Sequence, residues 1–198
     1  MFGDIPVPEP AAPSRALPPR LSNHHHRFRP GDVVTASTAS DHIVRLRKAD
    51  KALRIFSGLL VEIDEVLSED VIGGIPLNDT DKGRIILKFF PVDSVRLLSE
   101  INVYQALRSL QGSAIPQFIS VFIVDGFRGY ALGIRAIDGV TLRRYFETEA
   151  PTIELFRSAW SQLCALHDCG VAHMDVRAEN MLVKSDGSVV FIDFSISL

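Results

Sequence analysis

The spacing of apolar residues switches between strand-like and helix-like along this chain of 198 residues. Residues 58–63 alternate, and residues 84–90 form an apolar run that Pro91 ends, so both stretches predict strands. Gly73 and Gly74 are typical turn residues, and we interpret them as one of the turns between strands. The first half of the chain therefore predicts a three-stranded meander.

A change of period at residues 93–110 predicts an amphipathic helix, because apolar side chains recur there every three or four residues ahead of Gly112. Residues 117–124 and 130–137 follow as apolar runs joined by a glycine-containing turn, which is typical of a hairpin. We interpret Gly139, which comes next, as a hinge.

The rest of the chain predicts two helices and a second hairpin. Residues 141–149 fit a short helix, and residues 152–168 fit a long one with an apolar stripe that Gly170 ends. Residues 181–184 and 189–194 flank an Asp-Gly turn, which favours an antiparallel hairpin. The order expected after the hinge is therefore helix, helix, loop and hairpin.

Proline dominates the beginning of the chain. Seven of the 11 prolines lie at or before Pro30, mixed with Ser, Ala and Arg. Such a composition sustains neither a helix nor a sheet ladder, so we expect residues 1–40 to form a disordered Pro-rich tail. Residues 41–57 mix basic with apolar residues and predict only a weak helix or an irregular lead-in.

The overall charge favours neither a nucleic acid nor an anionic membrane as a partner, since 21 Lys and Arg face 24 Asp and Glu for a formal net charge of -3. No apolar run approaches the ~18 residues that a spanning helix needs, and the start of the chain lacks the features of an export signal. Two cysteines are too few for a disulfide scaffold. We expect a cytoplasmic protein with no nucleic-acid or membrane partner, and a nuclear location is the alternative.

Candidate catalytic residues are concentrated near the C-terminus. His173-x-Asp175 is followed by Asn180 and, beyond the predicted hairpin, by Asp193 and a phenylalanine. Transfer of a γ-phosphoryl group needs a carboxylate that orients the attacking hydroxyl and oxygen donors that hold Mg²⁺. This spacing therefore predicts a phosphoryl-transfer site.

The order of elements and motifs from about residue 58 onward resembles the protein kinase-like superfamily. The resemblance implies an α+β fold, with a small β-rich N-lobe in residues 41–138 and the first part of a helical C-lobe in residues 139–198. It also implies ATP and Mg²⁺ as cofactors. A complete kinase continues through an activation segment and further helices, so we expect a truncated chain of doubtful activity, whose partners are a protein substrate or a completing chain.

The resemblance implies a catalytic role for each residue at a matching motif position. Lys88 matches the strand lysine that contacts the nucleotide phosphates, and Glu100 matches the helix glutamate that holds this lysine. Asp175 matches the carboxylate that accepts the hydroxyl proton. Arg177 stands where kinases of the Ser/Thr type carry lysine, and its guanidinium would neutralise charge on the γ-phosphate.

Two sets of ligand-binding residues follow from the same resemblance. Asn180 and Asp193 match the Mg²⁺ ligands, and their oxygen donors suit a hard cation. Arg135, Ala136 and Ile137 occupy the hinge, where the family recognises adenine through backbone groups.

Three features depart from the family pattern. The glycine-rich nucleotide loop is missing, because only Gly73, Gly74 and Gly83 precede the strand lysine within the first strands. Met174 replaces the arginine of the catalytic loop, which argues against control by a phosphorylated activation segment. Ser195 replaces the glycine of Asp-Phe-Gly and removes its conformational freedom.

The sequence thus predicts an ATP- and Mg²⁺-dependent protein kinase-like phosphotransferase, of the Ser/Thr type. One alternative is a small-molecule kinase resembling the aminoglycoside and choline phosphotransferases, which the missing glycine-rich loop favours. The other is a non-catalytic pseudokinase module that binds partners.

Overall fold

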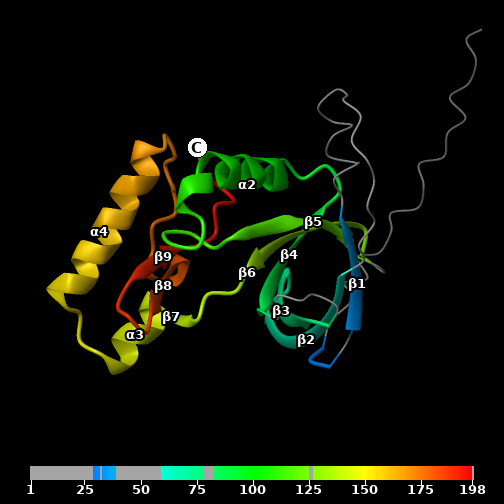
Figure 1. The fold of residues 1–198 in the computed structure, drawn as a ribbon, viewed down its shortest axis with the longest axis horizontal. Coiled ribbons are helices and arrows are strands. Elements are labelled where there is room, and N and C mark those ends of the chain that lie inside the picture. Colours follow the sequence, from blue (N-terminus) through cyan, green and yellow to red (C-terminus); the bar gives the residue numbers. More distant parts are fainter. Residues whose placement is uncertain (1–28, 32, 39–58, 78–82, 125–126, 198) are drawn as a thin grey trace, which may run out of the picture.

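The fold was determined as a computed structural model, which describes residues 29–31, 33–38, 59–77, 83–124 and 127–197. The described chain forms a six-stranded barrel, followed by a small sheet with helices beside it (Figure 1). The predicted α+β architecture, with a β-rich first part and a more helical second part, is confirmed.

The barrel is antiparallel throughout, in the order β1-β2-β3-β4-β6-β5, and α2 is inserted between β4 and β5. Alternate residues of its strands point inward and pack into one apolar cluster. Residues on the opposite face of β4 are left to face the second half of the molecule. The strands are β1 (Val33–Thr38), β2 (Leu59–Ser68), β3 (Val71–Pro76), β4 (Ile85–Pro91), β5 (Phe118–Val124) and β6 (Gly129–Arg135).

Strand β1 lies inside the stretch that we expected to be a disordered tail. It pairs with residues 59–62 of β2 and with residues 122–124 of β5, which closes the barrel. The prediction is therefore wrong for residues 33–38, because two strands far along the chain supply hydrogen-bonding partners on both sides. The expectations for residues 1–28 and 41–57 lie outside the described residues.

The glycine pair Gly73-Gly74 lies within β3, so the turn predicted there is wrong. The turn between β2 and β3 is formed by Glu69 and Asp70 instead. A Cβ atom on Gly74 would lie 2.7 Å from the carbonyl oxygen of Glu62 on β2, so a side chain is excluded by the close approach of the two strands. The glycines therefore serve strand packing rather than chain reversal.

Helix α2 (Val95–Ala106) begins after Ser94, whose Oγ accepts a hydrogen bond from the amide of Leu97 at 3.4 Å. The helix is shorter than the predicted 93–110, because the chain tightens into the 3₁₀ turn η1 (Arg108–Leu110) after its last residue. This turn redirects the chain into β5.

The second half of the chain contains the small antiparallel sheet β7-β8-β9, and its two helices both begin after a threonine cap. The two predicted helices and the predicted hairpin are confirmed, whereas the short strand β7 was not anticipated. The elements are β7 (Gly139–Thr141), α3 (Leu142–Thr148), α4 (Ile153–Asp168), the 3₁₀ turn η2 (Ala178–Asn180), β8 (Met181–Lys184) and β9 (Val189–Phe191).

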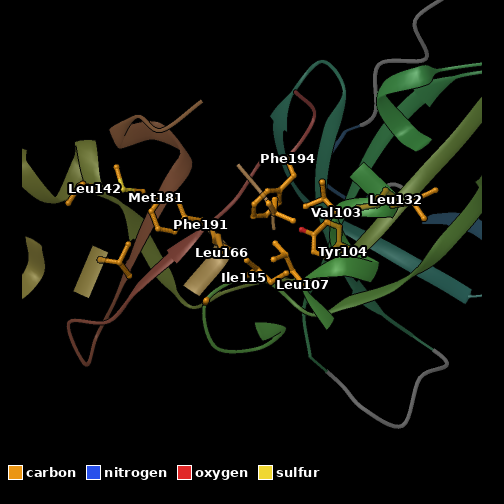
Figure 2. Packing of buried hydrophobic residues seen from close by; sticks show 14 of the residues in the cluster. Val103, Tyr104, Leu107, Ile115, Leu132, Leu142, Leu166, Met181, Phe191 and Phe194 are labelled. Atoms are coloured by element: carbon orange, nitrogen blue, oxygen red, sulfur yellow. The ribbon is translucent and has the colours of Figure 1, made fainter. Parts of the chain in front are cut away.

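One apolar core joins the two halves. Tyr104 of α2 lies beside Phe194, and Leu107, the residue after α2, belongs to the same cluster, which Phe191 and Leu166 continue toward the small sheet (Figure 2). The core therefore fixes α2 relative to the residues that follow β9, which are the residues that carry the candidate chemistry.

Helix α4 lies at the outer edge of the molecule (Figure 1). Its residues Ile153, Phe156 and Trp160 are all more than half exposed, so part of its apolar stripe faces solvent. No helix within the described ranges has the length and apolar character needed to cross a membrane.

Candidate active site

Lys88 projects from the outer face of β4. Ile85, Leu87 and Phe89 fill the barrel interior, so the alternation of the strand turns Lys88 to the opposite side. Its Nζ donates hydrogen bonds to Glu100 Oε2 at 2.9 Å and to Asp193 Oδ1 at 2.5 Å. One ammonium therefore joins the barrel, α2 and the segment after β9.

Glu100 comes from the buried face of α2, where its side chain is only 2% exposed. Burial raises the pKa of Glu100 above its ordinary value of 4.5, and the positive charge of Lys88 offsets only part of this effect. Burial opposes the charge of Lys88 as well, but Glu100 and Asp193 outweigh it and raise the pKa of the lysine. The lysine therefore stays charged in this position.

Asp193 follows β9 with a φ of 63°, a conformation that non-glycine residues rarely adopt. Its Oδ1 accepts hydrogen bonds from Lys88 and, at 2.9 Å, from Ser195 Oγ. Although burial acts against it, the hydrogen bond from Lys88 lowers the pKa of Asp193. The strained backbone thus directs an ionised carboxylate toward the lysine.

The loop between α4 and β8 holds Asp175 and Asn180 together. The Asn180 side-chain amide donates to Asp175 Oδ2 at 2.7 Å and to the Asp175 backbone carbonyl at 3.1 Å. Arg177 Nε lies 3.2 Å from the same Oδ2. Met174, the residue before Asp175, also has a positive φ, of 61°. Backbone strain is therefore present at Asp193 and at the residue that precedes Asp175.

His173 links the loop to the end of β9. Its Nε2 lies 3.0 Å from the carbonyl oxygen of Ile192, and its Nδ1 lies 3.4 Å from the amide nitrogen of Asp175. The amide is a donor, so the ring accepts at Nδ1 and donates from Nε2, which is the neutral tautomer. Burial lowers the pKa of His173 in agreement with this state. His173 is thus a packed structural residue.

Aromatic rings connect α2 with the catalytic loop. The Phe194 ring packs against His173, with 4.8 Å between centroids, and edge-on against Tyr104 at 5.8 Å (Figure 2). The Tyr104 hydroxyl is buried and has no hydrogen-bond partner among the described residues. Burial raises the pKa of Tyr104 well above 10.0. The position of Asp193 therefore depends on the packing of its neighbour Phe194.

The predicted hinge lies beside the edge of β4. Arg135 is the last residue of β6 and donates from Nη1 to the carbonyl oxygen of Gly83 at 2.9 Å. The amide of Ala136 donates to the carbonyl oxygen of Arg84 at 2.9 Å, so this amide is not available to a nucleobase. Ile137 follows in a segment without regular structure.

The turn between β2 and β3 lies close to the lysine. The amide of Phe89 donates to the carbonyl oxygen of Asp70 at 2.7 Å, which places this turn next to the residue that follows Lys88. The turn carries Glu69 and Asp70 where a phosphate-binding loop would carry glycines. The loss of the glycine-rich loop noted in the sequence therefore also makes this turn acidic.

The donor set fits a magnesium ion that is shared with a phosphate ligand. Lys88 and Ser195 both bond to Oδ1 of Asp193, and no described residue bonds to its Oδ2. The amide nitrogen of Asn180 is used by Asp175, which leaves the amide oxygen as a donor. No group of three or more metal-binding side chains occurs within the described ranges. A hard cation held by two protein oxygens requires further oxygens from its ligand.

Sequence reasoning missed two contributions to this region. The hydroxyl of Ser195 bonds to Asp193, although we had treated the residue only as the loss of a glycine. Arg84 forms an ion pair with Asp64, with 2.8 Å between Nε and Oδ2. The alternation of β4 could have placed Arg84 on the face of Lys88, but it carries no signal for the contact with Asp64, which is 20 residues away.

Comparisons with known proteins show similarity to a phosphotransferase family and to protein kinases. A family model described as the phosphotransferase enzyme family matches residues 77–172. The chain is 35% identical over 88 residues to the probable serine/threonine-protein kinase PknB of Lactococcus lactis, covering 41% of this chain and 14% of that protein. It is 32% identical over 130 residues to the serine/threonine-protein kinase ppk11 of Schizosaccharomyces pombe, covering 60% of this chain and 40% of that one.

A third similarity extends over most of the chain. The probable serine/threonine-protein kinase MARK-C of Dictyostelium discoideum is 22% identical over 196 residues, which is 90% of this chain and 23% of that protein. The chain thus spans less than half the length of each of these three relatives.

Proposed function

We propose that the candidate active site of this chain, which belongs to the protein kinase-like superfamily, binds ATP together with Mg²⁺ and transfers the γ-phosphoryl group to a hydroxyl. The observation that carries the proposal is the meeting of Lys88, Glu100 and Asp193. These residues come from β4, from α2 and from the segment after β9, and they are joined by bonds of 2.9 and 2.5 Å.

In this proposal Lys88 binds phosphate oxygens. Glu100 keeps the ammonium charged and holds it in one direction, because an unpaired buried ammonium would cost several kcal/mol. The 2% exposure of Glu100 makes the pair rigid on the α2 side. The contact of Lys88 with Asp193 is the more exposed of the two and is the one that a ligand can reach.

Asp175 is proposed to orient the attacking hydroxyl and to accept its proton at Oδ1. The other carboxylate oxygen, Oδ2, accepts a hydrogen bond from Asn180 at 2.7 Å and lies 3.2 Å from Arg177 Nε. These two contacts fix the carboxylate, which is the positioning that phosphoryl transfer requires. Arg177 is more than half exposed, so its guanidinium can turn toward the charge that develops on the γ-phosphate.

Asn180 and Asp193 would hold Mg²⁺, which would neutralise phosphate charge when bound. Nucleobase recognition is proposed near Arg135 and Ile137, where the chain leaves β6. Because the amide of Ala136 is already bonded to Arg84, we assign that residue a structural role at the base site.

The acceptor is proposed to be a serine or threonine hydroxyl of a protein, because the three relatives named above are serine/threonine-protein kinases. A completing chain is a further proposed partner. The cytoplasm is the proposed location, since both cysteines are free thiols, which suits a reducing compartment.

A small-molecule hydroxyl is the second candidate acceptor. The family model that matches residues 77–172 is that of a phosphotransferase family, and the β2–β3 turn has acidic residues in place of glycines. Assays of phosphate transfer to generic protein substrates and to amino-alcohols, run side by side, separate the two candidates.

Binding of Mg-ATP measured by calorimetry tests the site. We expect Lys88→Met and Asp193→Ala to weaken binding at least tenfold, because each removes a direct contact to phosphate or metal. Lys184→Met and Asp186→Ala are matched controls, since Lys184 at the end of β8 pairs with Asp186 in the β8–β9 turn, with 3.4 Å between Nζ and Oδ2. Unchanged affinity in both site variants would refute the assignment. Binding without transfer to either class of acceptor would instead support a pseudokinase.

A further inference from the structure

Arg84 directly precedes β4 and lies on the same side of the strand as Lys88. Ile85 and Leu87 point into the barrel, so Arg84, Ile86 and Lys88 project to the side on which the candidate active site lies. The pairing of β4 with β6 continues past the strand end, because the amide of Ala136 donates to the carbonyl oxygen of Arg84 at 2.9 Å. The backbone of Arg84 is therefore in regular register with the hinge.

The guanidinium of Arg84 extends across β3 and is fixed by two carboxylates of β2. Its Nε lies 2.8 Å from Asp64 Oδ2, and its Nη2 lies 3.0 Å from Asp64 Oδ1 and 2.5 Å from Glu65 Oε2. Several donors of the rigid guanidinium fork are thereby bonded, which defines the plane of the group. The side chain is still 36% exposed, so the two carboxylates leave part of the guanidinium open to solvent.

Gly73 provides the space that this arrangement needs. A Cβ atom on Gly73 would lie 2.2 Å from Arg84 Nη2 and 2.8 Å from Arg84 Cζ, so any side chain there would occupy the position of the guanidinium. Gly73 pairs with Ile86 in the β3–β4 register, two residues from Lys88. The guanidinium therefore covers the outer face of β3 in place of a β3 side chain.

The distance between Lys88 and Arg84 along the chain matches the length of the proposed nucleotide ligand. Lys88 marks the phosphate end, and four residues at about 3.3 Å each place Arg84 about 13 Å farther along the strand. Arg84 also lies beside Arg135 and Ala136, where we proposed nucleobase recognition. The extended length of a nucleoside triphosphate matches this separation between phosphate and base.

We propose that the guanidinium of Arg84 is one wall of the nucleobase site and stacks on the face of the base. This inference rests on the proposed function and adds a specificity-determining residue to it. A planar cation packs favourably on an aromatic ring. Two carboxylates largely cancel its charge, so it favours the flat base over the phosphates.

Calorimetry with two probes, Mg-ATP and Mg-tripolyphosphate, tests the inference, because tripolyphosphate has no base. We expect Arg84→Ala to weaken Mg-ATP binding about tenfold and to leave Mg-tripolyphosphate within twofold of the wild-type value. Arg84→Lys keeps an ion pair with Asp64 but lacks the planar group, and we expect the same selective loss. It is the variant to use if Arg84→Ala does not fold.

A double variant that replaces the lost guanidinium by another side chain gives an independent check. The double variant Gly73→Val with Arg84→Ala replaces the guanidinium by an apolar side chain from β3, and we expect it to recover most of the lost Mg-ATP affinity. Arg157→Ala is the matched control, because Arg157 is 74% exposed on α4 and pairs with Glu154 only at 3.9 Å. It should bind both probes as the wild type does.

The outcomes separate this inference from the proposed function. Equal Mg-ATP affinity in the wild type, Arg84→Ala and Arg84→Lys would overturn the stacking role while leaving the proposed function intact. An equal loss for both probes would also overturn it, because Arg84 would then act on the phosphates. Failure of the wild type to bind either probe would overturn the proposed function and this inference together.

Discussion

Replacing Lys88 with methionine should destabilise the folded protein and should do so in a pH-dependent manner. The substitution keeps most of the volume of the side chain but removes the ammonium that pairs with Glu100 at 2.9 Å and with Asp193 at 2.5 Å. Glu100 is 2% exposed and would be left as an uncompensated buried charge. Breaking a buried ion pair in this way costs about 3 kcal/mol at neutral pH.

The sign of the pH dependence follows from Glu100. Its pKa is already raised above 4.5 by burial, and the loss of Lys88 removes the main opposing effect. A carboxyl group with a higher pKa in the folded state binds more protons when folded, so stability decreases as pH rises from 4.5 through the folded-state pKa. The cost of Lys88→Met should therefore be largest near pH 8 and smaller near pH 5.

Urea unfolding at pH 5 and pH 8, followed by circular dichroism, measures both effects. The double variant Lys88→Met with Glu100→Leu should be more stable than Lys88→Met alone at pH 8, because no buried charge remains. Lys184→Met is the matched control, and its partly exposed pair with Asp186 should be worth less than about 1 kcal/mol. A loss below about 1 kcal/mol for Lys88→Met at pH 8, or one that does not shrink toward pH 5, would contradict this reasoning.

Three further predictions concern the same region. Ser195→Ala removes a 2.9 Å hydrogen bond to Asp193, so we expect a loss of about 1 kcal/mol at pH 7 in urea unfolding and a higher pKa of Asp193 in a carbon-detected NMR titration. The pKa of His173 is lowered by burial, so stability should fall as pH drops below 6.5, and His173→Phe should flatten this part of the pH profile. Trp160, the only tryptophan, is 68% exposed, so its emission should lie near that of free tryptophan and acrylamide should quench it efficiently.

The elements of the second half were predictable because their signals are local. Residues 152–168 carry a threonine cap and an apolar stripe, Gly170 follows them, and the helix forms where these signals place it. The hairpin around Asp186-Gly187 is likewise set by its turn residues. Local chemistry of this kind does not depend on the rest of the fold.

Strand β1 and the glycine pair were not predictable in the same way. Residues 33–38 follow a proline-rich stretch, and their strand is defined by pairing with residues 59–62 and 122–124, which are distant in sequence. Gly73 and Gly74 looked like turn residues, because their role depends on atoms of Arg84 and Glu62 that approach them in space. Contacts of long sequence separation therefore account for both errors.

The predicted pairing of Lys88 with Glu100 came from spacing and resemblance, and the structure adds the charge balance around it. Lys88 and Arg177 face three carboxylates at the candidate site, those of Glu100, Asp175 and Asp193, and the nearby turn adds Glu69 and Asp70. A polyanion that enters such a region meets more negative than positive charge. A triphosphate can therefore be held here only if a cation enters with it, which makes the oxygen donors of Asn180 and Asp193 as necessary to the proposed function as Lys88 itself.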